Sequence, residues 1–427
     1  MPFTTCQTNA FNAIVAWLNT PHTLNLENNI FVLSGAAGTG KTYLLDNLLE
    51  FVQVQDDLNI SMGIPSIVKG DNIHFTATTN NAVNLLTGAT TLKNPPKTIH
   101  SFLGLRVIKD FATGKSYIPY NNLKIDKDVM NGLIVIDEAS MLERKFLESL
   151  VAASKNIKIL LVGDYAQLPP VKEDKPYFMH MGFAYYDMID NVRSANSPDL
   201  QVLLNNYRQS IQNNKPYFNL NCKDVFCLTN SDFVEQLKAA VLNGENVKYL
   251  AYTNSAVNSC NSHIKKFITG SAEIQQGQVL VNFSVPHDSG LKVLSELYVH
   301  KVSDTKYTSK YLTTTVKGKL VNGTYFVANT LKENTDFMAE LRKLFSHNVN
   351  SDVYAEIVKA ESVFLDARPE YALTINRSQG QSYNDVYIDL NTINCIAKTK
   401  KMLATRLLYV ALSRARNNVY ITGNLAL

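Results

Sequence analysis

Short apolar runs alternate with helical patterns along most of the chain. Each run ends at a polar or glycine-rich turn, and a stretch with apolar residues at helical spacing usually follows. The runs lie at 30–33, 74–77, 132–137, 156–163, 247–253, 371–374, 385–390 and 419–422. Continuous apolar runs are typical of strands buried on both faces, and their alternation with helices favours parallel sheets. The pattern therefore predicts an α/β protein with two strand–helix halves.

Two segments interrupt this alternation. Residues 107–118 read as a β-hairpin with its turn at Gly114, inside an insertion of about 103–130. Residues 279–366 carry alternating polar and apolar positions with glycine turns, which predicts a small β-rich insertion. The expected domains are then a first α/β domain over 1–195, a second built from 196–278 and 367–427, and the β-rich insertion over 279–366.

Composition limits the class of protein without selecting one. Charged residues make up 18% of the chain, below the roughly 25% of an average soluble protein, which argues against disorder. A net charge of +4 permits a nucleic-acid partner but does not require one. The few, scattered cysteines argue against zinc and fit a reducing cytoplasm. No basic leader and no apolar run of about 18 residues occurs, so neither secretion nor a membrane span is expected.

The first strand leads into a loop that is suited to binding phosphate. Gly35-Ala36-Ala37-Gly38-Thr39-Gly40 follows the apolar run 30–33, and Lys41-Thr42 open an amphipathic helix. Glycines let backbone N–H groups turn toward a phosphate chain, and a helix N-terminus adds its positive dipole end. Lys41 is placed to reach the β/γ-phosphates, and the Thr42 hydroxyl to bind Mg²⁺. The alternative, a glycine turn that matches by chance, is disfavoured by the strand before it and the helix after it.

Polar side chains that end two later strands extend this hypothesis. Asp137-Glu138 follow the run 132–136, where one carboxylate can hold Mg²⁺ and the other can activate water. Gln167 follows the run 156–163 and is a short neutral group suited to sensing a γ-phosphate. Acidic pairs at strand ends also occur by chance, but here one follows a phosphate-binding loop.

Three polar segments leave two interpretations open. Gln7 lies in a helix expected over 1–19, either as an exposed helix residue or as an amide that reads the edge of adenine. The turn Thr78-Thr79-Asn80-Asn81 follows the strand at 74–77 and is either a grip for a nucleic-acid phosphate or an ordinary helix N-cap. The cluster Thr98-Ile99-His100-Ser101 is a second segment of the same kind.

Six motifs in a fixed order resemble those of superfamily 1 helicases. They are GAAGTGKT (35–42), IDEAS (136–140), GDYAQLPPV (163–171), NYRQ (206–209), YALTINRSQGQS (371–382) and LLYVALSRAR (407–416). The set is most similar to the RecD/Pif1 branch, superfamily 1B, and the compact length resembles the phage Dda-type helicases. The resemblance runs from Gln7 to Arg416, and the segments 163–171 and 408–416 are its most specific parts.

The resemblance implies two RecA-like domains with ATP and Mg²⁺ in the cleft between them. It assigns catalysis to Lys41, Glu138, Gln167, Arg208 and Arg414, the last two as arginine fingers, and Mg²⁺ to Thr42 and Asp137. Nucleotide contacts would come from the loop Gly35, Ala36, Ala37, Gly38, Thr39 and Gly40, with Gln7 reading adenine, Tyr207 stacking on it, and Gly380 nearby.

The resemblance also implies single-stranded DNA across the tops of both domains. The residues at the matching positions are Thr79, Thr98, His100, Ser101, Thr253, Asn254, Thr374, Asn376, Arg377 and Ser378, with Phe111 on the hairpin as a separation pin and 279–366 as an SH3-like domain. Asn376-Arg377 replace the His-Lys that is usual in the family, and Thr78-Thr79 its Pro-Thr. Both departures affect the DNA contacts more than the ATP chemistry.

The leading hypothesis is an ATP-dependent DNA helicase that moves 5′ to 3′ on single strands and splits duplexes at single/double-strand junctions. A P-loop ATPase that binds nucleic acid without separating strands is the alternative, as a translocase, switch or clamp loader. A binding protein that has lost hydrolysis is disfavoured because all of the expected ATP-site residues are present. The family also implies a monomer in the cytoplasm, that of the host if the protein is phage-encoded, with replication or recombination proteins as partners.

Replacement of the loop lysine tests the nucleotide assignment. We expect Lys41→Ala to abolish ATP hydrolysis, because the phosphates lose their main positive contact, while DNA binding is largely retained. A steady-state ATPase assay and a fluorescence-anisotropy titration with a single-stranded oligonucleotide measure the two effects. Hydrolysis that survives the substitution would refute the assignment of this site.

Overall fold

The structure is a computed structural model of the chain. It describes residues 2–23, 25–89, 94–105, 108–109, 116–120, 123, 125–170, 173–190, 197–271, 273–286, 289, 291, 295–329, 331–347 and 351–425. The chain forms two compact units. The first comprises Met1–Arg106, Tyr120–Val257 and Leu373–Leu427, and the second Val107–Pro119 and Asn258–Ala372. Within the described residues, no helix combines the length and the apolar character needed to cross a bilayer.

The first unit contains a six-stranded parallel sheet in the order β3-β2-β6-β7-β1-β8. Its central strands are buried along their length because their apolar runs face helices on both sides. Order and register confirm the α/β fold class expected from the sequence. The strands are β1 (Ile30–Gly35), β2 (Ile73–Ala77), β3 (Lys97–Thr98), β6 (Leu133–Asp137), β7 (Lys158–Gly163) and β8 (Ala184–Met188).

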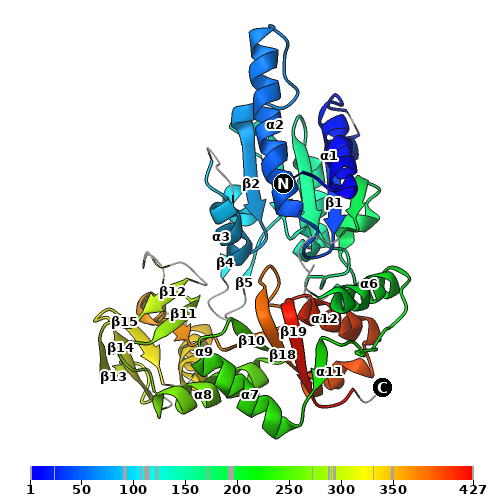
Figure 1. Ribbon diagram of the computed structural model, residues 1–427. Coiled ribbons are helices and arrows are strands. Elements are labelled where there is room, and N and C mark those ends of the chain that lie inside the picture. The colour runs from blue at the N-terminus through cyan, green and yellow to red at the C-terminus, as the bar shows by residue number, and fades with distance from the viewer. Residues whose placement is uncertain are drawn as a thin grey trace. The chain divides into compact units, whose positions relative to one another are not determined.

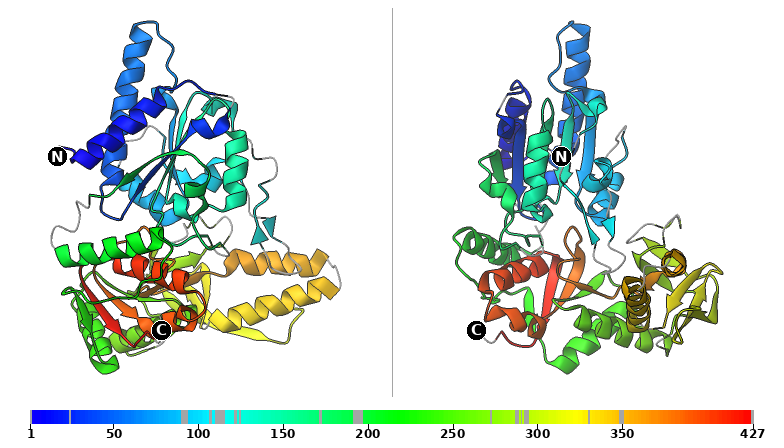
Figure 2. Two further views of the ribbon diagram at one scale, coloured as in Figure 1. Left: turned by 90° about the vertical axis from the view of Figure 1, so that its right-hand side faces the viewer. Right: turned by 180° about the vertical axis from the view of Figure 1, so that it is seen from behind.

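Helices cover both faces of this sheet, as the views in Figures 1 and 2 show. On one face α1 and α2 pack side by side over β1, and their apolar stripes form one core with Leu44, Leu48 and Phe31. On the other face α5 contributes Phe146, Leu147 and Leu150 to a second core. The helices are α1 (Thr5–Leu18), α2 (Lys41–Ser61), α3 (Asn80–Ala89), α4 (Ile99–Phe102) and α5 (Arg144–Ala153).

A second, five-stranded sheet in the same unit has the order β17-β10-β18-β19-β9. The pairs of β18 with β10 and β19, and of β19 with β9, are parallel. Its strands are β9 (Val225–Cys227), β10 (Val247–Ala251), β17 (Ala372–Thr374), β18 (Tyr383–Asp389) and β19 (Ala415–Thr422). Its helices are α6 (Pro198–Gln212), α7 (Asn230–Leu242), α8 (Asn254–Thr269), α11 (Leu390–Ala397) and α12 (Lys401–Leu412). α12 is buried from Ala404 to Leu412 and packs along α6.

The second unit contains the expected β-rich insertion. Two three-stranded antiparallel sheets form it, β12-β11-β16 and β13-β14-β15. Its strands are β11 (Val279–Ser284), β12 (Glu296–Tyr298), β13 (Val302–Thr308), β14 (Thr315–Val321), β15 (Tyr325–Ala328) and β16 (Asp366–Arg368). Two helices, α9 (Leu331–His347) and α10 (Ser351–Val363), were not expected from the sequence. Phe337, Leu341 and Ile357 on their inner faces pack into the core of the insertion.

The hairpin predicted at 107–118 is present as two short strands. β4 (Ile108–Lys109) and β5 (Ser116–Tyr117) pair antiparallel, with Ile108 opposite Tyr117. Phe111, proposed for the tip of this hairpin, lies outside the described residues. Its role as a separation pin therefore stays a prediction, as do the domain limits expected from the sequence.

Lys158 is an unusual component of the first core. It begins β7, has no exposed surface, and has no carboxylate among its described contacts. Its Nζ donates to the Thr20 hydroxyl at 2.9 Å and to the Trp17 carbonyl at 3.3 Å, and lies 5.1 Å from the centre of the Trp17 ring. Burial lowers the pKa of Lys158 to about 8 from its ordinary 10.5. The charged form is therefore less stable in the fold than in water.

We expect Lys158→Met to raise the free energy of unfolding at pH 7, by at most about 3 kcal/mol. The destabilisation by the charge is fully present below the folded pKa of about 8 and disappears as the pH approaches the unfolded pKa near 10.5. The gain from methionine should thus shrink between these pH values. Thermal unfolding at pH 7 and pH 10 measures it, with the exposed Lys155→Met as the matched control. A methionine variant that unfolds earlier at pH 7 would show that the hydrogen bonds outweigh the charge.

Candidate functional site

The loop between β1 and α2 has the backbone geometry of an anion cradle. Gly38 and Gly40 have φ of +88° and +81°, in the region that favours glycine. Gly40 is the N-cap of α2 and supplies no side-chain bond to the first helical turn. The N–H groups of that turn are therefore available to a ligand together with the positive end of the helix dipole.

Gln7 braces this loop. Its side-chain Nε2 donates to the Thr39 carbonyl at 3.1 Å, and its Oε1 accepts the Thr4 N–H at 3.0 Å within a capping box. Only 3% of the residue is exposed, so the interpretation of Gln7 as an exposed helix residue is wrong. Its role toward adenine stays a prediction.

The side chain of Lys41 turns back toward the loop that precedes it. Its Nζ donates to the carbonyls of Gly35 and Ala36 at 2.8 and 2.9 Å. Burial lowers the pKa of Lys41, and the charges of Asp164, Asp137 and Glu138 oppose this shift. The lysine therefore lies within electrostatic range of the carboxylates that end β6 and β7.

Glu138 is held in a strained backbone conformation at the end of β6. Its φ of +54° and ψ of +40° are rare for a residue with a side chain. Burial and then neighbouring Asp137 raise the pKa of Glu138 to about 7, while Arg414 and Lys41 act in the opposite direction. Burial also raises the pKa of Asp137, whose Oδ1 accepts the Glu138 N–H at 2.8 Å. Glu138 Oε2 is buried and has no hydrogen-bond partner among the described residues.

These groups suit a metal–phosphate ligand. Carboxylate and hydroxyl oxygens, as in Asp137 and Thr42, are the donors that Mg²⁺ prefers. No group of three or more His, Cys, Asp or Glu side chains able to hold a metal ion occurs in the described part of the chain, so a cation here would take ligands from the nucleotide and water as well. A glycine cradle, a half-buried lysine and a buried carboxylate oxygen without a partner among the described residues together fit a nucleotide with its cation.

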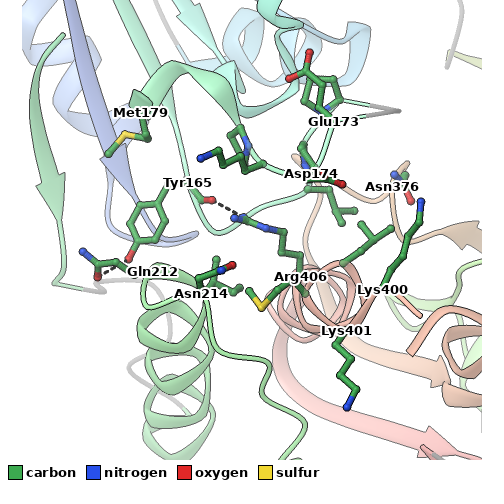
Figure 3. Close-up of a pocket in the computed structure, with 18 of the residues that line it drawn as sticks. Tyr165, Glu173, Asp174, Met179, Gln212, Asn214, Asn376, Lys400, Lys401 and Arg406 are labelled. Atoms are coloured by element: carbon green, nitrogen blue, oxygen red, sulfur yellow. Dashed lines mark hydrogen bonds between the residues drawn. The ribbon is translucent and has the colours of Figure 1, made fainter. Parts of the chain in front are cut away.

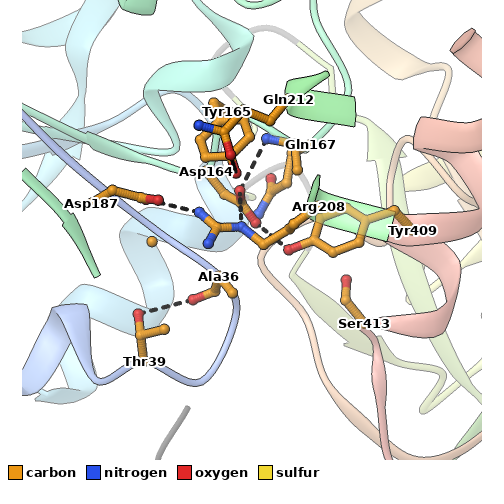
Figure 4. A network of polar contacts seen from close by, with 12 residues as sticks. Ala36, Thr39, Asp164, Tyr165, Gln167, Asp187, Arg208, Gln212, Tyr409 and Ser413 are labelled. Carbon is orange, nitrogen blue, oxygen red and sulfur yellow. Dashed lines mark hydrogen bonds and ion pairs between the residues drawn. The ribbon is translucent and has the colours of Figure 1, made fainter. Parts of the chain in front are cut away.

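Asp164, which follows β7, connects the two sheets of the unit (Figure 4). It has no exposed surface, and its carboxylate accepts three hydrogen bonds from the described residues. The donors are the Tyr409 hydroxyl at 2.5 Å, the Arg208 Nε at 3.3 Å and the Ala166 N–H at 3.0 Å. Tyr409 lies on α12 and Arg208 on α6. One carboxylate therefore links the six-stranded sheet to two helices that pack on the five-stranded sheet, which we call the second half of the unit.

Arg208 is surrounded by neutralising contacts. Its Nη2 donates to Asp187 Oδ1 at 2.9 Å, in addition to the bond to Asp164. Its guanidinium carbon lies 4.6 Å from the centre of the Tyr165 ring, a cation–π distance. The positive charge of Arg208 also lowers the pKa of Lys41, which places the arginine near the phosphate-binding loop.

Gln167 is held by the second half as well. Its Oε1 accepts from Gln379 Nε2 at 3.1 Å, and its carbonyl accepts from Arg406 Nη1 at 2.9 Å. Arg406 also donates to the Tyr165 carbonyl at 2.6 Å. Asp164, Asp187, Gln379, Arg406 and Tyr409 received no role from the sequence, although all but Asp187 lie in or next to the motifs quoted above.

Arg414, which follows α12, lies near Glu138 at the end of β6. It is buried, and its Nη1 donates to the carbonyls of Ser378 and Gln381 at 3.3 and 3.0 Å. Burial lowers the pKa of Arg414, and the charge of Glu138 is the largest opposing influence. Gly380 has a φ of +78°, and a Cβ at this position would lie 3.5 Å from Glu138 Oε1. The segment 378–381 thus places Arg414 and Gly380 beside the carboxylate of the first sheet.

Tyr207 departs from its expected position. Its side chain is fully buried in the core of the second half, edge-on to Tyr217 at 4.8 Å between ring centroids. Burial raises the pKa of the Tyr207 hydroxyl far above its ordinary value. The ring therefore has no exposed face on which an adenine base could stack in this structure.

Most of the predicted DNA-contacting hydroxyls make local backbone bonds. Thr79, Thr98, Thr253 and Thr374 each accept an N–H from the residue three positions later. An accepting hydroxyl keeps its own proton for a second partner, so N-capping and a phosphate contact are compatible. The Ser378 hydroxyl is buried and donates to the Ile375 carbonyl. His100 packs against Phe146, while Ser101, Asn254 and Arg377 are exposed.

A cavity of about 1490 Å³ adjoins this network (Figure 3). Tyr165, Asp187 and Arg406 form part of its wall, with Asn376 and the lysines 400 and 401 farther along. Residues 35–42 are not among its lining residues. The cavity therefore does not include the phosphate-binding loop, but it is lined in part by Asn376, one of the predicted DNA residues.

Two family models match parts of this chain. One describes an AAA domain and covers residues 22–173, and the other describes a UvrD-like helicase C-terminal domain and covers residues 369–422. The first match contains the phosphate-binding loop and Glu138, and the second contains Gly380 and Arg414.

Individual relatives agree with this pattern. The uncharacterized protein R530 of Acanthamoeba polyphaga mimivirus is 27% identical over 277 residues, with 58% of this chain and 54% of that protein covered. The RecBCD enzyme subunit RecD of Buchnera aphidicola (Schizaphis graminum) is 22% identical, with 93% and 71% covered. The chain thus spans about half of the viral relative. A Bacteroides Pif1 helicase structure with ADP-AlF3 and ssDNA has a TM-score of 0.51 at 18% identity, covering 100% of this chain and 94% of that one, which shows a shared fold.

The carboxylate of Asp164 generates a stability prediction. We expect Tyr409→Phe to lower the free energy of unfolding by about 1–3 kcal/mol, because a buried charge loses one donor that no water replaces. Thermal unfolding measures the change. The matched control is Tyr185→Phe, whose residue is 63% exposed on β8. Equal midpoints for the two variants would show that Asp164 does not depend on the tyrosine.

Proposed function

Because this chain is a RecD/Pif1-type protein of superfamily 1B, we propose that it hydrolyses ATP to move along single-stranded DNA. The direction we propose is 5′ to 3′, with separation of the strands where the DNA becomes double-stranded. ATP is the proposed substrate, and Mg²⁺ the cation that accompanies it.

One observation carries the proposal: charged side chains from the two halves of the first unit lie close enough to shift one another's pKa values. The first sheet supplies Lys41, Asp137 and Glu138, and the second half supplies Arg208 and Arg414. A simple phosphate-binding domain needs none of the second set. A site whose charges come from two halves makes their approach depend on the nucleotide, as a motor requires.

Each nucleotide-site residue has a role that its surroundings support. Lys41 would bind the phosphates in place of the loop carbonyls, and Asp137 with Thr42 would hold Mg²⁺, which when bound neutralises phosphate charge. Glu138 would take the proton of the attacking water, and its pKa of about 7 suits a general base at neutral pH. Gln167 would respond to the γ-phosphate, and Arg208 and Arg414 would stabilise the charge that develops on it.

The DNA part of the proposal rests on the relatives and on exposed polar groups. One structural relative is a Pif1 helicase in complex with ssDNA. Ser101 lies in α4, Asn254 begins α8 and Arg377 lies in the turn after β17, and each presents an exposed polar or charged side chain that can hold a nucleic-acid backbone. The other predicted DNA contacts, Thr79, Thr98, His100, Thr253, Thr374, Asn376 and Ser378, belong to the same proposal.

A strand-displacement assay tests the proposed function. We expect ATP-dependent unwinding of a duplex with a 5′ single-stranded tail, measured by separation of a fluorophore–quencher pair, and none with a 3′ tail. Unwinding from the 3′ tail alone would overturn the direction. DNA-stimulated hydrolysis without unwinding would leave a translocase that does not separate strands.

The matched control for this assay is Glu138→Gln, which keeps the size of the side chain and removes the base. We expect its rate of hydrolysis to fall by at least about 100-fold, the usual contribution of a general base. Its binding of ATP should remain, as a fluorescent-nucleotide titration can show. A glutamine variant that still unwinds DNA would remove Glu138 from the proposed mechanism.

A further inference from the structure

Arg208 has two carboxylate partners that differ in their surroundings. Its side chain is 6% exposed, and its guanidinium binds Asp164 through Nε and Asp187 through Nη2. The Nη2 bond is the shorter one, at 2.9 Å against 3.3 Å. These two ion pairs already neutralise the charge of Arg208. To contact a phosphate, Arg208 would therefore have to give up one of them.

The carboxylate of Asp164 is held by several contacts in the core. Its carboxylate has no exposed surface and also accepts the Tyr409 hydroxyl and the Ala166 N–H. If Arg208 left Asp164 entirely, a fully buried charge would lose a charged partner, which is strongly destabilising. The bond to Asp164 is therefore the one that Arg208 is expected to keep.

The surroundings of Asp187 constrain its carboxylate less than those of Asp164 do. It lies on the edge strand β8, its side chain is 24% exposed, and it lines the large cavity. Water can solvate its carboxylate when Arg208 departs, so release from Asp187 costs less than release from Asp164. The strand register pairs Asp187 with Ser34, the residue directly before the phosphate-binding loop. The exchangeable partner of Arg208 is thus located beside the predicted nucleotide site.

We propose that Asp187 is a positioning residue that competes with the γ-phosphate of ATP for Arg208. This inference rests on the proposed function, in which Arg208 contacts that phosphate. A phosphate oxygen would replace the Asp187 carboxylate on Nη2, while Nε keeps Asp164 and the guanidinium keeps the Tyr165 ring. The affinity for ATP is then the difference between two charge-assisted bonds to the same arginine.

Removal of the competing charge should tighten the binding of a nucleotide that has a γ-phosphate. We expect Asp187→Asn to lower the dissociation constant of AMP-PNP by about tenfold, which is the scale of one charged hydrogen bond exchanged for a neutral one. The dissociation constant of ADP should stay within about twofold, because ADP has no γ-phosphate to gain from Arg208. Titration calorimetry with each nucleotide measures the difference.

The opposite role for Asp187 predicts the opposite result. If Asp187 orients Arg208 toward the phosphate, Asp187→Asn weakens AMP-PNP binding, and the proposal is overturned. Equal effects on AMP-PNP and ADP would also overturn it, because a general disturbance of the fold does not distinguish the two nucleotides. Should the asparagine variant not fold, Asp187→Ser removes the same charge and answers the same question.

Two further variants complete the experiment. Asp190→Asn removes an exposed charge from the segment directly after β8 and should leave both dissociation constants unchanged. In an Arg208→Ala background, Asp187→Asn should have no effect on AMP-PNP, because the arginine for which the two acceptors compete is absent. A tightening that persists in this background would refute competition for Arg208. A wild-type chain that binds neither nucleotide would instead refute the proposed function.

Discussion

The buried carboxylate of Asp164 is the interaction on which the site depends. It lies at the end of β7 in the first sheet, yet two of its three hydrogen-bond donors come from α6 and α12 of the second half. An unpaired carboxylate without exposed surface is strongly disfavoured. The fold therefore keeps Arg208 and Tyr409 close to the end of β7, and with them the loop that carries Gln167. Arg406 adds to this connection by binding two carbonyls of the same loop.

The charges around the phosphate-binding loop are, by contrast, incompletely compensated. Burial raises the pKa values of Asp137 and Glu138 and lowers that of Lys41, and each shift disfavours the charged form. Glu138 in addition has a strained backbone and a buried oxygen that has no partner among the described residues. Strain and unsatisfied charge of this kind concentrate where a protein binds or transforms a ligand. The stable network around Asp164 and the unsatisfied group around Glu138 are neighbours, so the first can hold the second in place.

The sequence was sufficient for the α/β class, the central strands of both sheets and the β-rich insertion, because continuous apolar runs and glycine turns are local signals. It did not predict the short or outer strands β3, β8 and β9. It also did not predict α9 and α10, although Phe337 and Leu341 are four residues apart, as on one helix face, because the alternating segments around them favoured strands. The sequence did not single out Asp187, because AYYDM on β8 matches no motif. The position of Asp187 depends on the pairing of β8 with β1. The burial of Tyr207 could not be foreseen either, since one face of α6 decides it. Residues whose role depends on a partner that is distant in sequence are therefore not identified by motifs.

The positively charged side chains of the site share one property that bears on how it works. Lys41 donates to carbonyls of its own loop, Arg208 binds two carboxylates, and Arg414 donates to the carbonyls of Ser378 and Gln381. Each cation already has protein acceptors, so a phosphate must displace them rather than add to free donors. Binding energy is then the difference between two sets of strong bonds, and such differences are small enough to reverse in each cycle. A site with free cations would bind phosphate more tightly and release it more slowly, which is the opposite of what the proposed motor needs.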